Sequence, residues 1–124
     1  MRQFILGLSA LLLTACQAQE KKVDSKHQLL SPIEFKAELE KSDDAYLIDV
    51  RTPQEYEAGT IEGAENLNIM DSTFEEGIVE LDKNKTVFVF CARGGRSGKA
   101  ANILKKEGFK QVIDLKGGFN NWQN

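Results

Sequence analysis

The chain has 124 residues, of which 41% are hydrophobic and 28% are charged, and its formal net charge at pH 7 is -3. This length and composition are typical of one globular domain built around a single hydrophobic core. The charge balance is mildly acidic and no basic stripe offsets it, which argues against nucleic acid as a partner.

The first 15 residues have the pattern of a secretory signal peptide. A short basic start at residues 1–2 is followed by an apolar stretch over residues 4–13, which is too short to span a bilayer as a mature helix. The run LTAC at residues 13–16 also resembles a bacterial lipobox, in which the cysteine is diacylated and becomes the new N-terminus. An ordinary signal peptide with a chance cysteine is the alternative. Lipidation of Cys16 would anchor the protein to a bacterial membrane.

The sequence contains two cysteines, Cys16 and Cys91. If Cys16 carries lipid, Cys91 is the only thiol of the mature protein, and an internal disulfide is excluded even in an exported compartment. We therefore expect Cys91 to be reactive. Residues 16–27 are polar and lack periodicity, which predicts a tether, and the domain over residues 28–124 would face the periplasm or the cell exterior.

Capping boxes predict the first two helices. The motif SPIE at residues 31–34 predicts a helix over residues 32–41, with proline at its first position. The motif TPQE at residues 52–55 predicts a short helix, which Gly59 can end. Between them, residues 45–50 form a short apolar run that is typical of a buried strand.

The second half of the chain continues the alternation of strands and helices. The strand expected over residues 86–90 is apolar at four successive positions, which is typical of a strand covered on both sheet faces. The pattern predicts an α/β fold in which helices cover both faces of a parallel central sheet. The other expected elements are an extended segment over residues 60–68, a helix capped by Ser72 with Phe74, Ile78 and Leu81 on one face, a helix over residues 97–107 ended by Gly108, a strand over residues 112–115, and a short terminal helix carrying Phe119 and Trp122.

Cys91 directly follows the expected strand over residues 86–90 and begins the glycine-rich, basic run CARGGRSG. In parallel sheets, sites form where strands end. Gly94 and Gly95 allow backbone N–H groups to converge on one centre, and the helix that follows adds the positive end of its dipole. A thiol held there loses its proton readily and becomes a nucleophile. An inert buried cysteine is the alternative, but packing alone accounts poorly for the basic loop.

Four motifs in this order resemble the single-domain rhodaneses. The run CARGGRS at residues 91–97 is similar to the family's active-site pattern C-x-x-G-x-R-S. The runs LIDVRTPQEY at 47–56 and GTIEGA at 59–64 are similar to its early strand and helix and to its G-H-I-x-G-A turn. The closing L-x-G-G-x-x-x-W pattern is matched by LKGGFNNW at 115–122, so the resemblance covers about residues 29–122.

The resemblance implies a rhodanese-like fold and a sulfurtransferase that needs neither cofactor nor metal. In this family the cysteine, here Cys91, takes the outer sulfur of an anionic donor such as thiosulfate as a persulfide, and a thiol or cyanide acceptor removes it. A persulfide carrier or binding module with little free-standing turnover is the second hypothesis. The residues expected to bind the donor are Ala92, Arg93, Gly94, Gly95, Arg96 and Ser97.

A small phosphatase or arsenate reductase of the same fold is a third hypothesis. Such relatives carry one residue more between the cysteine and the arginine than the four that separate Cys91 from Arg96. The smaller ring is expected to suit a sulfur atom better than a full phosphate.

The sequence departs from the family pattern at two positions. Thr60 stands where the histidine of the G-H-I turn is usual, and Arg93 adds a charge where a neutral residue is frequent. Asp49 and Arg51 follow the first buried strand, and they either orient the catalytic loop or form an ion pair that braces the short helix through Glu55 or Glu57. The only histidine, His27, is assigned to the tether.

Overall fold

The computed structural model describes residues 26–122. The predicted signal peptide, Cys16 and the tether up to residue 25 lie outside this range. The strands are β1 (Lys26–Leu30), β2 (Tyr46–Asp49), β3 (Glu65–Asn66), β4 (Val87–Phe90) and β5 (Gln111–Leu115). The helices are α1 (Pro32–Lys41), α2 (Pro53–Ala58), α3 (Thr73–Ile78), α4 (Gly95–Lys106) and α5 (Gly118–Trp122).

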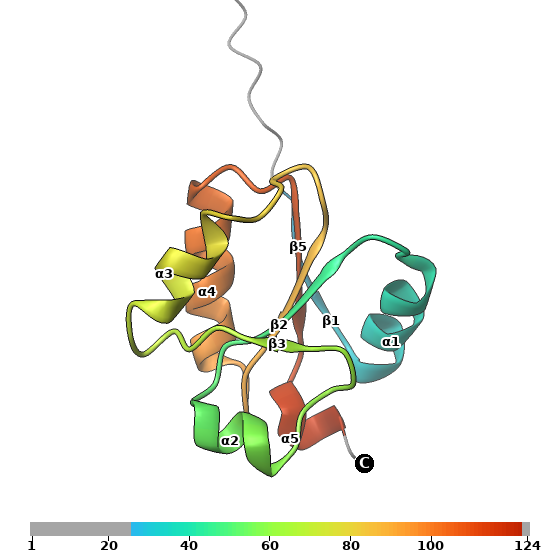
Figure 1. Cartoon of the computed structure of the whole chain (residues 1–124). Coiled ribbons are helices and arrows are strands. Elements are labelled where there is room, and N and C mark those ends of the chain that lie inside the picture. Colours follow the sequence, from blue (N-terminus) through green and yellow to red (C-terminus); the bar gives the residue numbers. More distant parts are fainter. Residues whose placement is uncertain (1–25, 123–124) are drawn as a thin grey trace, which may run out of the picture.

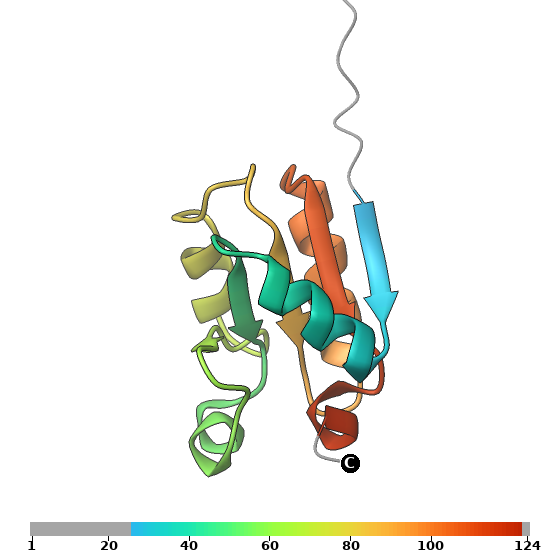
Figure 2. The same cartoon turned by 90° about the vertical axis from the view of Figure 1, so that its right-hand side faces the viewer.

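The strands form one five-stranded sheet in the order β1-β5-β4-β2-β3, and every pair is parallel. Helices α1 and α5 pack on one face of this sheet, and α3 and α4 pack on the other (Figures 1 and 2). The predicted α/β fold with helices on both faces is confirmed. Between residues 26 and 122, no helix is long and apolar enough to cross a membrane.

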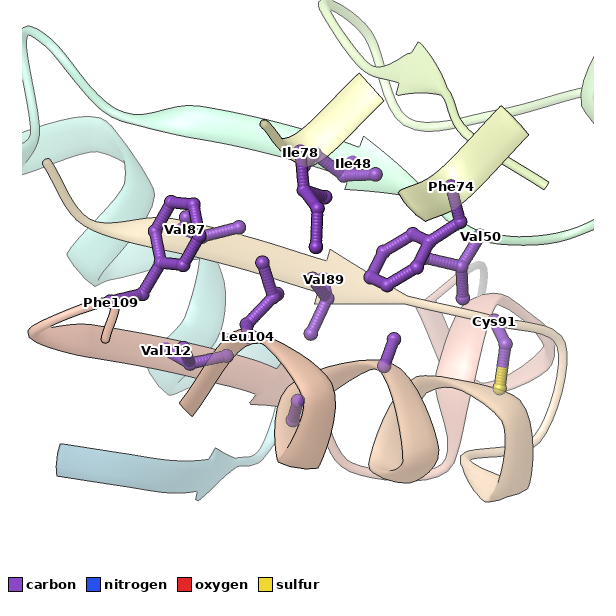
Figure 3. Packing of buried hydrophobic residues seen from close by; sticks show 12 residues of the cluster. Ile48, Val50, Phe74, Ile78, Val87, Val89, Cys91, Leu104, Phe109 and Val112 are labelled. Atoms are coloured by element: carbon purple, nitrogen blue, oxygen red, sulfur yellow. The ribbon is translucent and has the colours of Figure 1, made fainter. Parts of the chain in front are cut away.

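Alternation along β4 divides the core into two layers. Phe88 and Phe90 belong to the cluster on the α1 and α5 side, whereas Val87 and Val89 belong to the cluster under α3 and α4. Successive side chains of a strand point to opposite faces, so Cys91 continues the second series. Figure 3 shows Cys91 directly after β4, with its sulfur directed toward the first turn of α4.

Both capping boxes are present and fix where α1 and α2 begin. The hydroxyls of Ser31 and Thr52 accept from the N–H groups of Glu34 and Glu55, and each glutamate carboxylate accepts from the backbone N–H of its capping residue. The N–H of Gly59 then bonds back to the last turn of α2. Helix α2 lies beyond the carboxyl ends of the strands, at the same end of the molecule as α5 (Figure 2).

The N-terminal edge of the sheet differs from the prediction. Lys26 and His27 belong to β1, which pairs in parallel with β5, so the folded region begins before residue 28 and His27 is not a tether residue. A strand at a sheet edge is covered by neighbours on one side only and tolerates polar side chains. The polar composition of this segment therefore concealed a strand.

Two helix boundaries also differ from the prediction. Helix α4 begins at Gly95 instead of residue 97, because Gly94 adopts φ +116 at the N-cap and its carbonyl accepts from the N–H of Gly98. Helix α3 ends at Ile78, after which the N–H of Leu81 bonds to the Ile78 carbonyl in a tight turn. Leu81 still packs against the core, although it lies beyond the helix.

Candidate active site

The sulfur of Cys91 lies inside the loop that connects β4 to α4. The Cys91 side chain is 1% exposed. Its Sγ accepts a hydrogen bond from the N–H of Gly94 at 3.0 Å, and the thiol donates to Oγ of Ser97 at 3.4 Å. The φ of +116 at Gly94 favours glycine and turns its N–H toward the sulfur. The loop therefore brings Cys91, Gly94 and Ser97 together.

Opposing effects act on the pKa of the Cys91 thiol. Burial raises the pKa, whereas the hydroxyl and N–H of Ser97 and the N–H groups of Gly94 and Arg93 lower it, and the net result lies below the ordinary value. Hydrogen bonds to the charged form favour that form. The site therefore stabilises a thiolate, which is the nucleophilic form of cysteine.

Arg96 is engaged by a residue that the sequence analysis did not assign to the site. Its Nη1 and Nη2 donate to Oε1 and Oε2 of Glu55 at 2.7 and 3.0 Å. This forked hydrogen bond is the largest cause that lowers the pKa of Glu55 to about 2. The expected donor-binding group thus joins α4 to α2. The sequence analysis named Glu55 as the last residue of a capping box and as one candidate partner of Arg51, and not as a partner of Arg96.

Arg93 differs from Arg96 in its surroundings. Its side chain is exposed, and no ion pair within the described part of the chain involves it. A Cβ atom built on Gly94 or Gly95 would have no neighbour within 4 Å, so the outer side of the loop is open. Arg93 is therefore the exposed arginine of the loop, whereas Arg96 is paired with Glu55.

Helix α5 is hydrogen-bonded to the beginning of the loop. The N–H of Phe119 donates to the carbonyl of Cys91 at 2.7 Å, and the N–H of Asn120 donates to the carbonyl of Ala92 at 3.0 Å. A Cβ atom on Gly118 would lie 2.5 Å from the Ala92 carbonyl. Ala92 thus contributes its backbone, and the glycine pair of the C-terminal motif permits the close contact.

Asp49 and Arg51 form a buried pair beside the loop. Nη2 of Arg51 donates to Oδ2 of Asp49 at 2.8 Å and to the carbonyl of Gly59 at 2.7 Å. The guanidinium lies 4.4 Å from the ring centroid of Phe119. The hydroxyl of Thr60 donates to the same Asp49 oxygen at 2.9 Å.

This geometry corrects one expectation about the pair. Arg51 binds Asp49 and not Glu55 or Glu57, so the brace connects the end of α2 with α5. Thr60 supplies a hydrogen-bond donor at the position where the family usually has histidine. Across residues 26–122, no group of three or more His, Cys, Asp or Glu side chains could hold a metal ion.

A cysteine with a lowered thiol pKa, in a loop at the carboxyl end of a central parallel strand, is the arrangement typical of proteins that use a nucleophilic cysteine. The match to a family model narrows this class. The model described as Rhodanese-like domain matches residues 31–124, and the chain belongs to this family.

Individual relatives agree with this assignment. YqhL of Bacillus subtilis (strain 168) is 41% identical over 93 residues, which are 75% of this chain and 70% of YqhL. YrkF of the same organism, whose name describes a sulfur carrier protein, is 33% identical over 88 residues, which are 71% of this chain and 46% of YrkF. The chain thus spans less than half of YrkF. A solved rhodanese-like domain protein from Staphylococcus aureus has a TM-score of 0.68 at 28% identity, covering 77% of this chain and 90% of that one.

Proposed function

We propose that the protein is a sulfurtransferase that carries a sulfane sulfur on Cys91 as a persulfide. The observation that carries the proposal is the position of the sulfur, 3.0 Å from the N–H of Gly94 in a loop that lowers the thiol pKa. We expect the same N–H groups to hold the persulfide anion with little reorganisation. Membership of the family and the similarity to YrkF support sulfur as the group that is carried.

The reaction we propose has two displacement steps. The Cys91 thiolate attacks the outer sulfur of a thiosulfate-like donor, the Sγ–S bond forms, and the bond to the sulfonate breaks so that sulfite leaves with its electron pair. A thiolate or cyanide then attacks the terminal sulfur of the persulfide. The new acceptor–sulfur bond yields a persulfide or thiocyanate, and Cys91 is returned as the thiolate.

We assign different roles to the two loop arginines in this reaction. Arg93 is exposed and binds the anionic donor, which lessens the repulsion between thiolate and thiosulfate. Arg96 acts through Glu55 and holds the loop against α2. Donor recognition is therefore placed on Arg93 and on the backbone N–H groups.

The experiment uses the chain with Cys16→Ser, so that Cys91 is the only thiol. After incubation with thiosulfate, the intact mass should increase by one sulfur atom, and cyanide should then release thiocyanate. Cys91→Ser should abolish both signals. Stoichiometric sulfur loading with negligible turnover would instead support the carrier, and phosphate-ester hydrolysis without sulfur loading would support the phosphatase alternative.

We further propose that the protein is exported and anchored to a bacterial membrane through lipid on Cys16. The support is the lipobox-like run at residues 13–16 after a basic and apolar start. Cys16→Ser should move the protein from the membrane fraction to the soluble fraction. Unchanged membrane association in that variant would contradict lipid anchoring.

A further inference from the structure

One buried carboxyl group has no role in the site as described. Asp114 on β5 is 2% exposed, and its Oδ1 has no hydrogen-bond partner among residues 26–122. Burial raises its pKa. A carboxylate that is buried without full hydrogen bonding is costly, so Asp114 lowers the stability of the fold when it is ionised.

Strand register places Asp114 beside the catalytic loop. Asp114 pairs with Val89 of β4, and Val89 faces α4. Cys91 lies two positions beyond Val89 and points to the same face (Figure 3). Ser97 in the first turn of α4 is completely buried there and contacts the sulfur at 3.4 Å.

Ser97 also connects the sulfur to Asp114. The Ser97 hydroxyl lowers the pKa of the Asp114 carboxyl and so opposes the effect of burial, which places the two groups close to each other on this face of the sheet. In the structure, the same hydroxyl donates to the Gly94 carbonyl at 3.2 Å. Ser97 has one proton, and three acceptors surround it: the Gly94 carbonyl, the Cys91 thiolate and the Asp114 carboxylate.

Asp114 also lies near His27, which belongs to the edge strand β1. Nε2 of His27 on β1 lies 3.8 Å from Oδ2 of Asp114, and the His27 side chain is 26% exposed. His27, Asp114, Ser97 and Cys91 are therefore neighbouring polar groups on one face of the sheet. They extend from a partly exposed edge strand to the buried sulfur.

We propose that Asp114 is a positioning residue which, together with His27, sets the reactivity of the Cys91 thiol through the Ser97 hydroxyl. When Asp114 is protonated, it is neutral and a weaker acceptor for Ser97, and the hydroxyl is freer to turn toward the thiolate. When Asp114 is ionised, it draws the hydroxyl away and adds a negative charge near the sulfur. The proposal rests on Cys91 being the nucleophile of the proposed function.

The charged and titratable groups around these neighbouring polar groups come from several elements. His27 faces Asp114 from β1, and Cys91 faces it through Ser97 from the end of β4. Arg96 of α4 interacts electrostatically with Cys91 and is itself paired with Glu55 of α2. The pair of Arg96 and Glu55 is left unchanged in the variants below, so its contribution is constant.

The test measures how the rate of Cys91 alkylation by iodoacetamide depends on pH, in the full chain with Cys16→Ser. Asp114→Asn keeps the shape of the side chain but cannot ionise, and it should lower the apparent thiol pKa by about one unit. The alkylation rate at a pH below that pKa should rise about threefold, because the gain in thiolate exceeds its loss of nucleophilicity. Asp43→Asn, which removes the same charge from an exposed position, should leave the profile unchanged.

His27→Gln is the second variant, and it changes a partly exposed side chain on an edge strand. His27 lowers the pKa of Asp114, so its removal should make Asp114 ionise less readily and shift the thiol pKa in the same direction by a smaller amount. This effect should disappear in the Asp114→Asn background, because His27 acts through Asp114. A purely structural role would alter the unfolding midpoint and leave the alkylation profile unmoved.

The proposal is overturned if folded Asp114→Asn and His27→Gln proteins, checked by circular dichroism, retain the pH profile of the parent chain. Alkylation reports only on the thiol, so the two proposals can fail separately. A shifted profile without thiocyanate formation would contradict the proposed function alone. Normal sulfur transfer with an unshifted profile would contradict the role of Asp114 alone.

Discussion

Arg93 and Arg96 belong to the same loop but differ in what their guanidinium groups contact. Arg96 is committed to a forked pair with Glu55, a residue of another element. Such a pair fixes two planar groups relative to each other, so it suits the support of a loop better than the capture of a mobile anion. Arg93 is exposed and has its donors available.

At this scale we predict that Arg93→Gln weakens donor binding. The KM for thiosulfate should increase about fivefold with a smaller change in kcat, because one exposed charge contributes about 1 kcal/mol to binding a nearby dianion. Steady-state thiocyanate formation measures both constants. Arg93→Lys should recover most of the affinity.

Lys99→Gln is the matched control for Arg93, since it removes one exposed positive charge from α4 outside the loop. Its KM should remain near that of the parent chain. An equal rise in KM for Lys99→Gln would indicate a general electrostatic effect and would contradict the specific role of Arg93.

Contacts between elements give the loop its shape. Helix α5 begins at the second glycine of a pair, and the N–H groups of Phe119 and Asn120 in its first turn donate to the carbonyls of Cys91 and Ala92. Gly118 adopts φ +65 and is so close to the loop backbone that a Cβ atom would overlap the Ala92 carbonyl. The position of the loop therefore depends on the C-terminal helix, although the two are separated by the whole of α4 and β5.

At the scale of elements we predict that Gly118→Ala destabilises the protein by about 3 kcal/mol, through backbone strain and overlap with the loop. Urea unfolding followed by circular dichroism measures the change. Gly98→Ala is the control, because Gly98 lies within α4 and a Cβ atom there meets nothing within 4 Å. It should be neutral or stabilising by about 0.5 kcal/mol. Equal destabilisation by both substitutions would contradict the steric argument.

At the scale of the whole molecule, the sequence predicted features that arise from local patterns. Capping boxes located α1 and α2, and four apolar residues located β4. The glycine-rich run after β4 indicated an N–H-lined loop, and the structure shows one. These signals depend on residues that are close together along the chain.

Features that depend on distant residues could not be predicted in this way. Arg96 meets Glu55 from 41 positions away, and His27 meets Asp114 across paired strands from opposite ends of the domain. The polar residues of β1 resemble a tether until the partner strand is known. A capping box also conceals that Glu55 has a second function, because one carboxylate satisfies both patterns.

The carboxyl groups of Glu55 and Asp114 should make the free energy of unfolding depend on pH in opposite directions. The Arg96 guanidinium lowers the pKa of Glu55 from 4.5 to about 2, so its stabilising contribution is present above pH 4.5 and is lost as the pH falls toward 2. Solvent screening limits the size of this contribution, because about a third of the Glu55 side chain is exposed. Burial raises the pKa of Asp114 above 3.8, so folding is favoured by its protonated form and this contribution is lost as the pH rises through the folded pKa.

We predict that urea midpoints measured from pH 2 to pH 8 separate the two groups. Glu55→Gln should flatten the acid side of the profile, because the neutral amide cannot gain or lose a proton between pH 4.5 and 2. Asp114→Asn should stabilise the protein at neutral pH relative to the parent chain, since it removes a carboxylate that is buried without full hydrogen bonding, and the gain should vanish at acid pH. Asp43→Asn serves as the exposed control in the same series. A lower midpoint for Asp114→Asn at neutral pH would show that the ionised carboxyl is the stabilising form, which would reverse the sign assigned to burial at this position.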